Sequence, residues 1–435
     1  MVSKKSDKEL WLFAIIIMFG FAAVFRLMVG VGYINEYDTY WYRSWALDLP
    51  NGMFDVYLRA KDISLDYPPL YLIPLYFIGH IYKIITPAAN TYTQMLIMKF
   101  FPLLFDMLCG VVIYRICSKK FSQKVAFVAS LAWLFNPSMF FNSTMWGQTD
   151  SIMAFFLILS FWYLSEKKFA ASGVIFAVAC LTKYQSLLFA PVFGMQLLYE
   201  SKFKIKQLAT TIGAGLATIF IVFLPFSIAC KNPLLIIDVY VTGAGTYEYC
   251  SLYCFNFYGM VGLDWHTRIL DTTKILGPIT YQHFGYFMVF LAIAVLIAMY
   301  MFAKEEKRNP WVGGLFFMQC VFMFMTRMHE RYQVVVLPFV LLAYFTTRKK
   351  GFGISFILLT IMTGLNQFMI LLFHQYGDLQ TPWEANFPFI LRCMSVINFA
   401  LFIYVSYLCV AHFLSKRTKS DLPQPQDITR EEVTA

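Results

Sequence analysis

The sequence predicts an all-α, polytopic membrane protein with about twelve transmembrane helices. Hydrophobic residues make up 59% of the chain and charged residues only 14%, whereas soluble domains carry about 25% charge. Apolar runs close to the length of a spanning helix, about twenty residues, recur along the whole chain. Lysine and arginine gather in short loops between these runs, a distribution typical of cytoplasmic loops.

Twelve apolar segments are expected to cross the membrane. With these spans, both termini and every basic loop fall on one side, which the positive-inside rule assigns to the cytoplasm. These loops account for the net charge of +10, so the bilayer is an expected partner and nucleic acid is not. The expected spans are 10–31, 96–116, 125–144, 150–165, 169–183, 184–199, 207–229, 283–303, 310–327, 331–347, 353–374 and 388–414.

Two large loops then face the extracytoplasmic side, 32–95 and 230–282. Segment 67–87 is long enough to cross, but one extra crossing would place every later basic loop outside. We therefore expect this segment to form a helix that lies at the outer face, in the interface or dipping partly into the bilayer. Pro68 and Pro69 fit the start of such a helix.

The same topology divides the chain into three parts. Residues 1–345 form a transmembrane module with both outer loops, residues 346–414 add the last transmembrane helices, and 415–435 form a polar, disordered cytoplasmic tail. Cys250 and Cys254 share an outer loop and are interpreted as unpaired thiols, with a short disulfide as the alternative. No histidine and cysteine spacing fits a zinc site, and no metal or other cofactor is expected.

Five polar clusters interrupt the apolar runs, and the topology brings all five to the outer face. Because the topology rests on lysine and arginine counts, it does not presuppose where the aspartate and histidine clusters lie. Five such loop ends on one face predict a functional site. The clusters are Asp38–Arg43, Asp66–Pro69, Trp146–Asp150, Lys183–Gln185 and His329–Arg331.

Asp38 is the candidate general base. It lies just after the first span, where a carboxylate can accept a proton from an acceptor hydroxyl at neutral pH. The alternative is an ordinary solvated loop aspartate. Glu36 and Arg43 lie close to it in the chain and are candidate acceptor-binding residues. Asp66 is another, although it could instead cap the helix that follows.

Trp146 and Gln148 are candidate sugar-binding residues. An indole ring covers the C–H face of a sugar, and an amide bonds its hydroxyl groups. Gly147 between them permits a tight turn. Asp150 is a further candidate, with a helix N-cap as its structural alternative.

The later clusters supply cations. Lys183 is a candidate phosphate contact together with Gln185, although a lone outer lysine also serves as a membrane anchor. Arg327, His329 and Arg331 run against the positive-inside bias, and a lipid-linked phosphate would explain them because arginine matches phosphate oxygens. The alternative for Arg331 is a salt bridge with its neighbour Glu330. Within span 96–116, Lys99 and Asp106 are expected to form a structural pair.

Taken in order, these motifs resemble those of the C-type glycosyltransferase superfamily. The resemblance runs from about residue 10 to 345. It is strongest to bacterial integral membrane mannosyltransferase-like proteins, which are related to the second mannosyltransferase of GPI-anchor synthesis and to the glucosyltransferases of dolichol-linked oligosaccharides. The motifs are Asp38-x4-Arg43-x-Trp45, Asp66-Tyr67-Pro68-Pro69, Asn136-Pro137, Trp146-Gly147-Gln148-x-Asp150, Lys183-x-Gln185 and His329-Glu330-Arg331-Tyr332.

The resemblance implies an inverting transfer of a sugar from a polyprenyl-phosphate donor to a lipid or glycan acceptor on the extracytoplasmic face. It implies Asp38 as general base, with Glu36 as an alternative, and Lys183, His329 and Arg331 near the donor phosphate. It also implies a metal-independent reaction. Neither the sugar nor the acceptor follows from the sequence.

Two other functions fit a polytopic membrane protein. A transporter or flippase of lipid-linked sugars is the main alternative, but such proteins tend to show internal repeats and polar breaks near the membrane midplane. Here the polar clusters lie at the ends of the expected spans and no repeat is visible. A non-catalytic assembly protein would be expected to have lost the acid or the cations, and this chain keeps both.

Overall fold

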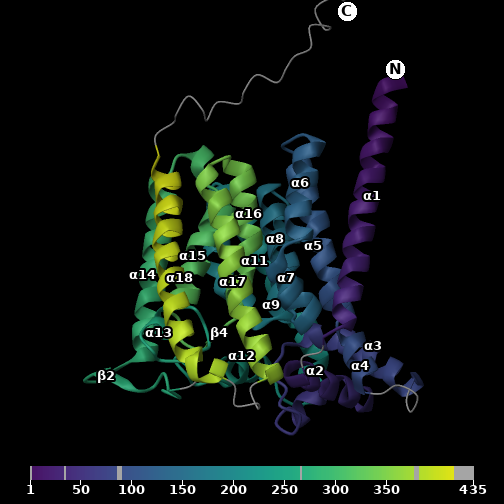
Figure 1. Ribbon diagram of the computed structural model, residues 1–435, viewed down its shortest axis with the longest axis vertical. Helices are drawn as coiled ribbons and strands as arrows, with labels where there is room; N and C mark the ends of the chain where they lie inside the picture. Colours follow the sequence, from purple (N-terminus) through teal and green to yellow (C-terminus); the bar gives the residue numbers. More distant parts are fainter. Residues whose placement is uncertain (1, 34–35, 86–90, 265–266, 377–381, 416–435) are drawn as a thin grey trace, which may run out of the picture.

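The computed structural model is a helical bundle closed at one end by a layer of short helices (Figure 1). It describes residues 2–33, 36–85, 91–264, 267–376 and 382–415. In these residues the secondary structure is almost entirely helical, with four strands of two or three residues each. The expectation of an all-α fold is confirmed, whereas nearly all of the expected tail, from residue 416 on, lies outside the described residues.

Six helical segments in the described part of the chain are long and apolar enough to cross a membrane. A seventh is formed if α6 (Gln123–Leu134) and the following segment Pro137–Trp146, which is bent by 41°, count as one span. The six segments belong to α1 (Val2–Val31), α4 with α5 (Thr91–Met98, Phe100–Ser118), α11 (Ile205–Ala229), α14 (Tyr281–Phe302), α17 (Lys350–Tyr376) and α18 (Pro382–Leu414).

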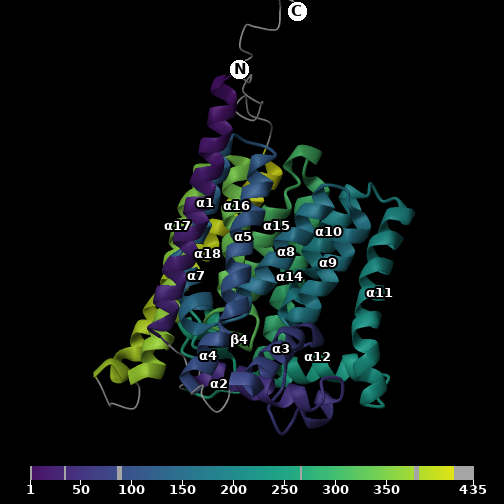
Figure 2. The ribbon, with the colours of Figure 1, turned by 90° about the vertical axis from the view of Figure 1, so that its right-hand side faces the viewer.

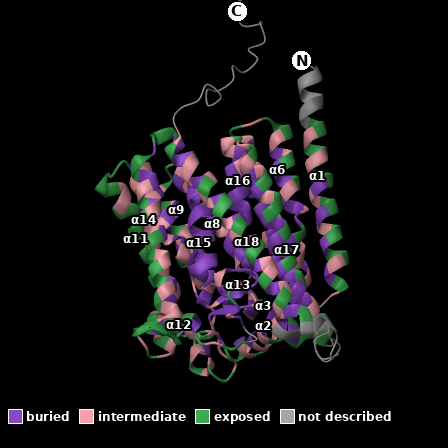
Figure 3. Cartoon of the chain, turned by 60° about the vertical axis from the view of Figure 1, so that its left-hand side comes forward, coloured by how far each residue is buried: buried purple, intermediate pink, exposed green. Residues whose placement is uncertain are grey.

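The remaining expected spans are shorter helices, so a count of twelve is not confirmed. A fifteen-residue helix such as α15 is about 22 Å long, less than the roughly 30 Å of a bilayer core. Every residue of α15 is buried, because this helix lies in the interior of the bundle (Figure 3). The shorter helices are α8 (Asp150–Ser165), α9 (Phe169–Thr182), η4 (Tyr184–Phe189), α10 (Ala190–Glu200), α15 (Pro310–Phe324), η6 (Tyr332–Val335) and α16 (Val336–Thr347).

A layer of short elements, the cap, lies at the end of the bundle away from the start of α1 (Figures 1 and 2). The expected outer-face segment 67–87 forms α3 here. A Cβ on Gly79 would lie 1.9 Å from the carbonyl oxygen of Ala46, so only glycine permits α3 to pack this closely on α2. The cap comprises α2 (Glu36–Asp48), η1 (Leu49–Asn51), η2 (Val56–Arg59), α3 (Pro69–Ile85), α4, α12 (Leu235–Gly245) and α13 (Phe257–Met260), with the strands β1 (Ser251–Leu252), β2 (Lys274–Leu276), β3 (Ile279–Thr280) and β4 (Met328–His329) nearby.

The basic loops meet at the opposite end. Lys119 forms an ion pair of 2.5 Å with Glu166, and the Arg348 guanidinium lies 4.1 Å from the ring centroid of Phe121. The structure thus separates basic loops from polar motifs along the bundle. That the basic end is cytoplasmic remains a prediction from the positive-inside rule.

The expected pair between Lys99 and Asp106 is wrong. Asp106 instead accepts from the Arg26 Nε of α1 at 2.9 Å, and both side chains are buried. Lys99 lies at the break between α4 and α5, where its ammonium donates to the carbonyls of Gly30 and Tyr33. Carbonyls at a helix end attract a cation, so Lys99 holds the end of α1.

Candidate active site

Asp38, near the start of α2, is held by two donors from a distant part of the chain. Its Oδ2 accepts from Trp146 Nε1 at 2.5 Å and from Gln148 Nε2 at 2.9 Å. The hydroxyl of Tyr42, one helical turn along α2, donates to Gln148 Oε1 at 3.1 Å. The first and third sequence motifs therefore meet, and the orientation of the carboxylate is fixed.

A π-helical segment, η3 (Phe140–Trp146), carries Trp146 to this position. Gly147 ends it with φ +79°, a conformation that favours glycine, and a Cβ there would lie 3.2 Å from Lys99 Cγ. The backbone N–H of Gln148 then returns to the carbonyl of Asn142 at 3.0 Å. Segments of π-helix occur often at functional sites, and this one turns two donors toward one carboxylate.

Asp38 lines a cavity of about 200 Å³, which we call the reaction cavity. Its walls come from α2, from the segment before α3, from η4, and from the chain around the His-Glu-Arg motif. The lining residues are Asp38, Trp41, Tyr42, Trp45, Ser64, Asp66, Tyr67, Tyr184, Gln185, Thr246, Tyr247, Arg331 and Tyr332.

The His-Glu-Arg motif begins within β4, which pairs in parallel with β1 so that His329 lies opposite Leu252. Arg331 Nη1 donates to Glu330 Oε1 at 2.6 Å and lies 3.3 Å from His329 Nδ1. The Arg331 guanidinium also lies 5.3 Å from the ring centroid of Trp146, which itself holds Asp38. The salt bridge with Glu330, considered as the alternative for Arg331, is thus present, and the same arginine lines the reaction cavity.

The protonation state of this motif determines which of its nitrogen atoms can donate a hydrogen bond to a ligand. Burial and the nearby Arg331 lower the pKa of His329, so the ring is neutral at pH 7. Burial alone would raise the pKa of Glu330, but Arg331 holds it at about 2. Because arginine only donates, a hydrogen bond from Arg331 Nη1 to His329 Nδ1 requires the tautomer with its proton on Nε2, whereas a contact of Nδ1 with Glu330 Oε2, 3.7 Å away, requires the other tautomer. Within the described residues, neither His329 Nε2 nor Arg331 Nε has a hydrogen-bond partner.

Lys183 and Asp150 pair with each other behind the cavity. Lys183 Nζ lies 2.5 Å from Asp150 Oδ1, and the two side chains are 2% and 0% exposed. Asn142 Nδ2 donates to the other oxygen, Oδ2, at 3.0 Å. Thr149, not Asp150, occupies the N-cap position of α8, so the interpretation of Asp150 as a cap is wrong. Lys183 is not among the residues that line the cavity, and its position favours a structural role.

Two more expected site residues are engaged away from the reaction cavity. Arg327 forms an ion pair of 2.7 Å with Asp271, and Arg43 Nε donates to Gln94 Oε1 at 2.6 Å. The side chain of Glu36 lies outside the described residues.

Asp66 and Gln185 do line the reaction cavity. Burial raises the pKa of Asp66 to about 6. Gln185 Nε2 donates to the Tyr332 hydroxyl at 2.8 Å, whereas its Oε1 has no partner among the described residues.

Tyrosines form much of the cavity wall, and the sequence analysis assigned them no role. The Tyr67 hydroxyl bonds the Tyr42 hydroxyl at 3.0 Å and the Thr149 hydroxyl at 3.1 Å, which ties α2 to the start of α8. Tyr67 and Tyr332 stand inside the quoted motifs, so their position was the available signal. Tyr42 and Tyr184 likewise lie inside the predicted clusters Asp38–Arg43 and Lys183–Gln185.

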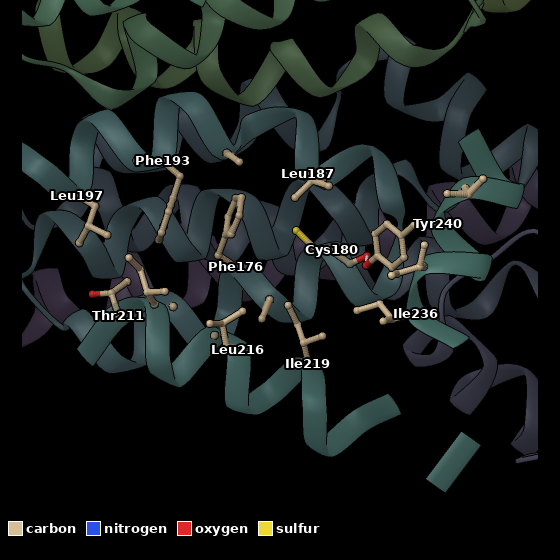
Figure 4. Close-up of a pocket in the computed structure, with 18 residues that line it drawn as sticks. Phe176, Cys180, Leu187, Phe193, Leu197, Thr211, Leu216, Ile219, Ile236 and Tyr240 are labelled. Atoms are coloured by element: carbon tan, nitrogen blue, oxygen red, sulfur yellow. Dashed lines mark hydrogen bonds between the residues drawn. The ribbon is translucent and has the colours of Figure 1, made fainter. Parts of the chain in front are cut away.

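An elongated groove of about 620 Å³ lies beside the reaction cavity, between α9, α10, α11 and α12 (Figure 4). Its lining is aliphatic, aromatic or glycine apart from a few side chains, and its hydroxyls are satisfied internally. Thr211 Oγ1 donates to the Gln207 carbonyl and the Tyr240 hydroxyl to the Cys180 carbonyl. In η4, Leu187 lines this apolar groove, while Tyr184 and Gln185 line the reaction cavity.

All nine cysteines lie in the part of the chain that the structure describes, and each is free. Cys250 and Cys254 are free and buried, as the sequence interpretation favoured. Among the described residues there is no group of three or more histidine, cysteine, aspartate or glutamate side chains that could hold a metal ion.

Comparison with known proteins gives a family match and several curated relatives. Residues 71–228 match the family described as dolichyl-phosphate-mannose-protein mannosyltransferase. GPI mannosyltransferase 1 of Eremothecium gossypii is 30% identical over 132 residues, which is 28% of this chain and 33% of that protein. GPI mannosyltransferase 1 of Saccharomyces cerevisiae is 21% identical over 27% of this chain and 29% of that protein.

These alignments cover a third or less of each curated relative. The family match extends from α3 to α11 and so includes Trp146, Gln148 and Asp150, together with Lys183 and Gln185. Over this segment the chain is similar to membrane mannosyltransferases of the C-type glycosyltransferase superfamily.

Proposed function

We propose that this protein is an inverting glycosyltransferase. It moves a hexose from a polyprenyl-phosphate-linked donor to a hydroxyl group of an acceptor glycolipid or cell-surface glycan. One observation carries the proposal: a single small cavity has the Asp38 carboxylate and the Arg331 guanidinium among its walls, with an apolar groove beside it. The similarity to mannosyltransferases supports mannose as the first hexose to test.

In the proposed reaction, Asp38 accepts the proton of the acceptor hydroxyl. The acceptor oxygen forms a bond to the anomeric carbon of the sugar, and the bond from that carbon to the phosphate oxygen breaks. The products are the new glycoside and the polyprenyl phosphate, and the configuration inverts because there is one displacement. Trp146 and Gln148 hold the carboxylate in place, so its orientation is set before substrate arrives.

The leaving phosphate gains negative charge, and we assign its stabilisation to Arg331 and His329. With the His329 proton on Nε2, their unused Nε–H and Nε2–H groups are donors of the kind that a phosphate oxygen requires. A buried donor without a partner is uncommon and calls for an explanation. An anionic ligand supplies one. In this mechanism side-chain hydrogen-bond donors stabilise the negative charge of the monophosphate, and no metal is assigned a role.

The apolar groove is assigned to the polyprenyl chain. It runs along the bundle from Leu197 and Thr211 to Tyr240 beside the cap (Figure 4). Its few hydroxyls bond the backbone, so the lining suits a hydrocarbon. Because η4 contributes to both the groove and the reaction cavity, a chain in the groove would leave its phosphate near Arg331. By the positive-inside rule this end of the bundle is extracytoplasmic.

The decisive experiment measures transfer by purified protein in nanodiscs. Polyprenyl phosphates carrying radiolabelled mannose, glucose or galactose are incubated with a membrane lipid extract and with wild type, Asp38→Asn or the matched control Asp62→Asn. Asp62 is exposed and lines none of the cavities described. We expect Asp38→Asn to lose transfer about 10²–10⁴-fold, the usual contribution of a general base.

Asp62→Asn should keep the wild-type rate. Transfer by Asp38→Asn at the wild-type rate would remove the assigned base. Movement of label across vesicle membranes without a new glycoside would support a transporter instead.

A further inference from the structure

A third cavity, the side cavity, opens next to the reaction cavity. It has a volume of about 620 Å³, about three times that of the reaction cavity, and lies between the segment that precedes α3 and the helix α12. Ser64, Asp66 and Thr246 line both cavities, so the two adjoin. A ligand that occupies the side cavity can therefore place one end beside Asp38.

The helix α12 borders both the side cavity and the apolar groove, and Val241 lines both. Asp238 and Thr242, one turn apart, line the side cavity, whereas Ile237 and Tyr240 line the groove. Figure 2 shows α12 beneath α9 and next to α11 at the edge of the bundle. A Cβ on Gly243 would lie 2.9 Å from the Asp66 carbonyl oxygen, so the end of α12 is seated closely against the reaction cavity. The two faces of one helix thus border two chemically different spaces.

The side cavity has the chemistry of a glycan site. About half of its lining residues are hydrophobic, and the rest include Asp66, Asp238, Asn232 and Thr242, whose carboxylates, amide and hydroxyl can bond sugar hydroxyls. Asn232 Nδ2 donates to Asp238 Oδ2 at 2.7 Å. The lining has two carboxylates and one ammonium group, that of Lys61, a balance that disfavours a phosphorylated or carboxylated ligand. Its volume falls in the range of about 300–1,000 Å³ that is usual for ligand sites, whereas the reaction cavity is smaller.

We propose that the side cavity binds the acceptor as a neutral or amino-bearing oligosaccharide. It would hold the sugar units behind the one whose hydroxyl reacts at Asp38, so the enzyme extends glycans of more than one unit. This inference rests on the proposed function, which it deepens by naming the acceptor class. In this arrangement the two substrates bind on different faces of α12, the polyprenyl chain of the donor on the apolar face and the acceptor on the polar face.

The test uses alkyl mannosides with one, two or three hexoses as acceptors. In the wild type we expect KM to fall at least tenfold from one hexose to three. Thr242→Phe places a large ring in the side cavity at an exposed position. It should abolish the dependence on length and leave the KM for donor unchanged. Asp238→Asn, also at an exposed position, should weaken the dependence without filling space.

A contrasting variant lies on the other face of α12. Ile237→Asn should raise the KM for a long-chain donor and leave the length dependence intact, because Ile237 lines only the groove. A length dependence that survives Thr242→Phe, or a donor KM that rises in that variant, would overturn the inference.

Saturation-transfer NMR separates this inference from the proposed function. The trisaccharide glycoside should bind the wild type in nanodiscs without donor, and Thr242→Phe should lose the signal. Binding of that kind without any transfer would refute the glycosyltransferase and keep a glycan site. Transfer to a monosaccharide acceptor without trisaccharide binding would keep the enzyme and refute the side cavity as its acceptor site.

Discussion

The reaction cavity and the apolar groove lie next to each other but differ in whether the polar atoms around them have hydrogen-bond partners within the protein. Around the cavity, Gln185 Oε1, His329 Nε2 and Arg331 Nε have no hydrogen-bond partner among the described residues. In the groove, the hydroxyls of Thr211 and Tyr240 bond carbonyls of the chain itself. The two unpartnered nitrogen atoms, His329 Nε2 and Arg331 Nε, favour an anionic ligand, Gln185 Oε1 can accept from a hydroxyl group, and the satisfied hydroxyls of the groove favour an apolar ligand. The difference is the one expected for the two ends of the lipid-linked phosphate that we propose as donor.

The largest effect is expected from breaking the buried ion pair between Lys183 and Asp150, which lies behind the reaction cavity. Lys183→Ala leaves the buried Asp150 carboxylate without its cation, which should cost about 3–5 kcal/mol of stability. The double variant Lys183→Met, Asp150→Asn should recover most of this, as measured by thermal unfolding in detergent. A double variant that folds well but loses donor affinity would instead support a direct role for Lys183 with phosphate.

The next prediction alters the unused donors directly. Arg331→Lys keeps a cation beside Glu330 but loses the forked guanidinium, and we expect kcat to fall about 100-fold. Arg327→Lys is the matched control, because Arg327 is occupied by Asp271 and lines none of the cavities described. Equal losses in the two variants, measured as initial rates of transfer, would bring Arg327 back into the donor site.

A smaller effect is expected from filling the groove. A Cβ on Gly194 meets no atom within 4 Å, and the residue lines the groove. Gly194→Leu should raise the KM for a long-chain donor about tenfold, or about 1.4 kcal/mol, and barely change that for a farnesyl donor. Gly213→Leu is a control of the same chemistry on α11, also open but outside the groove lining. Equal KM values for both donors in Gly194→Leu would separate the groove from the carrier chain.

The smallest effect concerns pH. The pKa of Asp66 is raised from 3.8 to about 6, so the folded protein holds this proton more tightly than the unfolded chain. Its contribution to stability is therefore full below about pH 4 and is lost as the pH rises to 6. The unfolding temperature should fall over this window, and Asp66→Asn should flatten that part of the curve. An identical slope in the variant would assign the pH dependence to another group.

The sequence predicted the membrane fold and the meeting of its motifs better than it predicted individual roles. Apolar runs and basic loops identified the helices. They did not show which helices are too short to span the membrane, because a helix buried inside the protein is as apolar as one that faces lipid. Asp38, Trp146 and Arg331 converge as their motifs suggested. Ion pairs between residues that are far apart in the chain could not be predicted from the spacing of charges in the sequence. Asp106, for example, pairs with Arg26, which lies eighty positions away.

The separation in sequence between the site residues also bears on biosynthesis. Asp38 is made early, but Trp146 follows 108 positions later and Arg331 belongs to the segment before α16. During synthesis the chain would therefore carry its proposed general base long before the residues proposed to bind the donor phosphate exist. Contacts so distant in sequence form late. A nascent or truncated chain that ends before β4 should be inert toward lipid-linked sugars, so activity would begin only once the bundle is nearly complete.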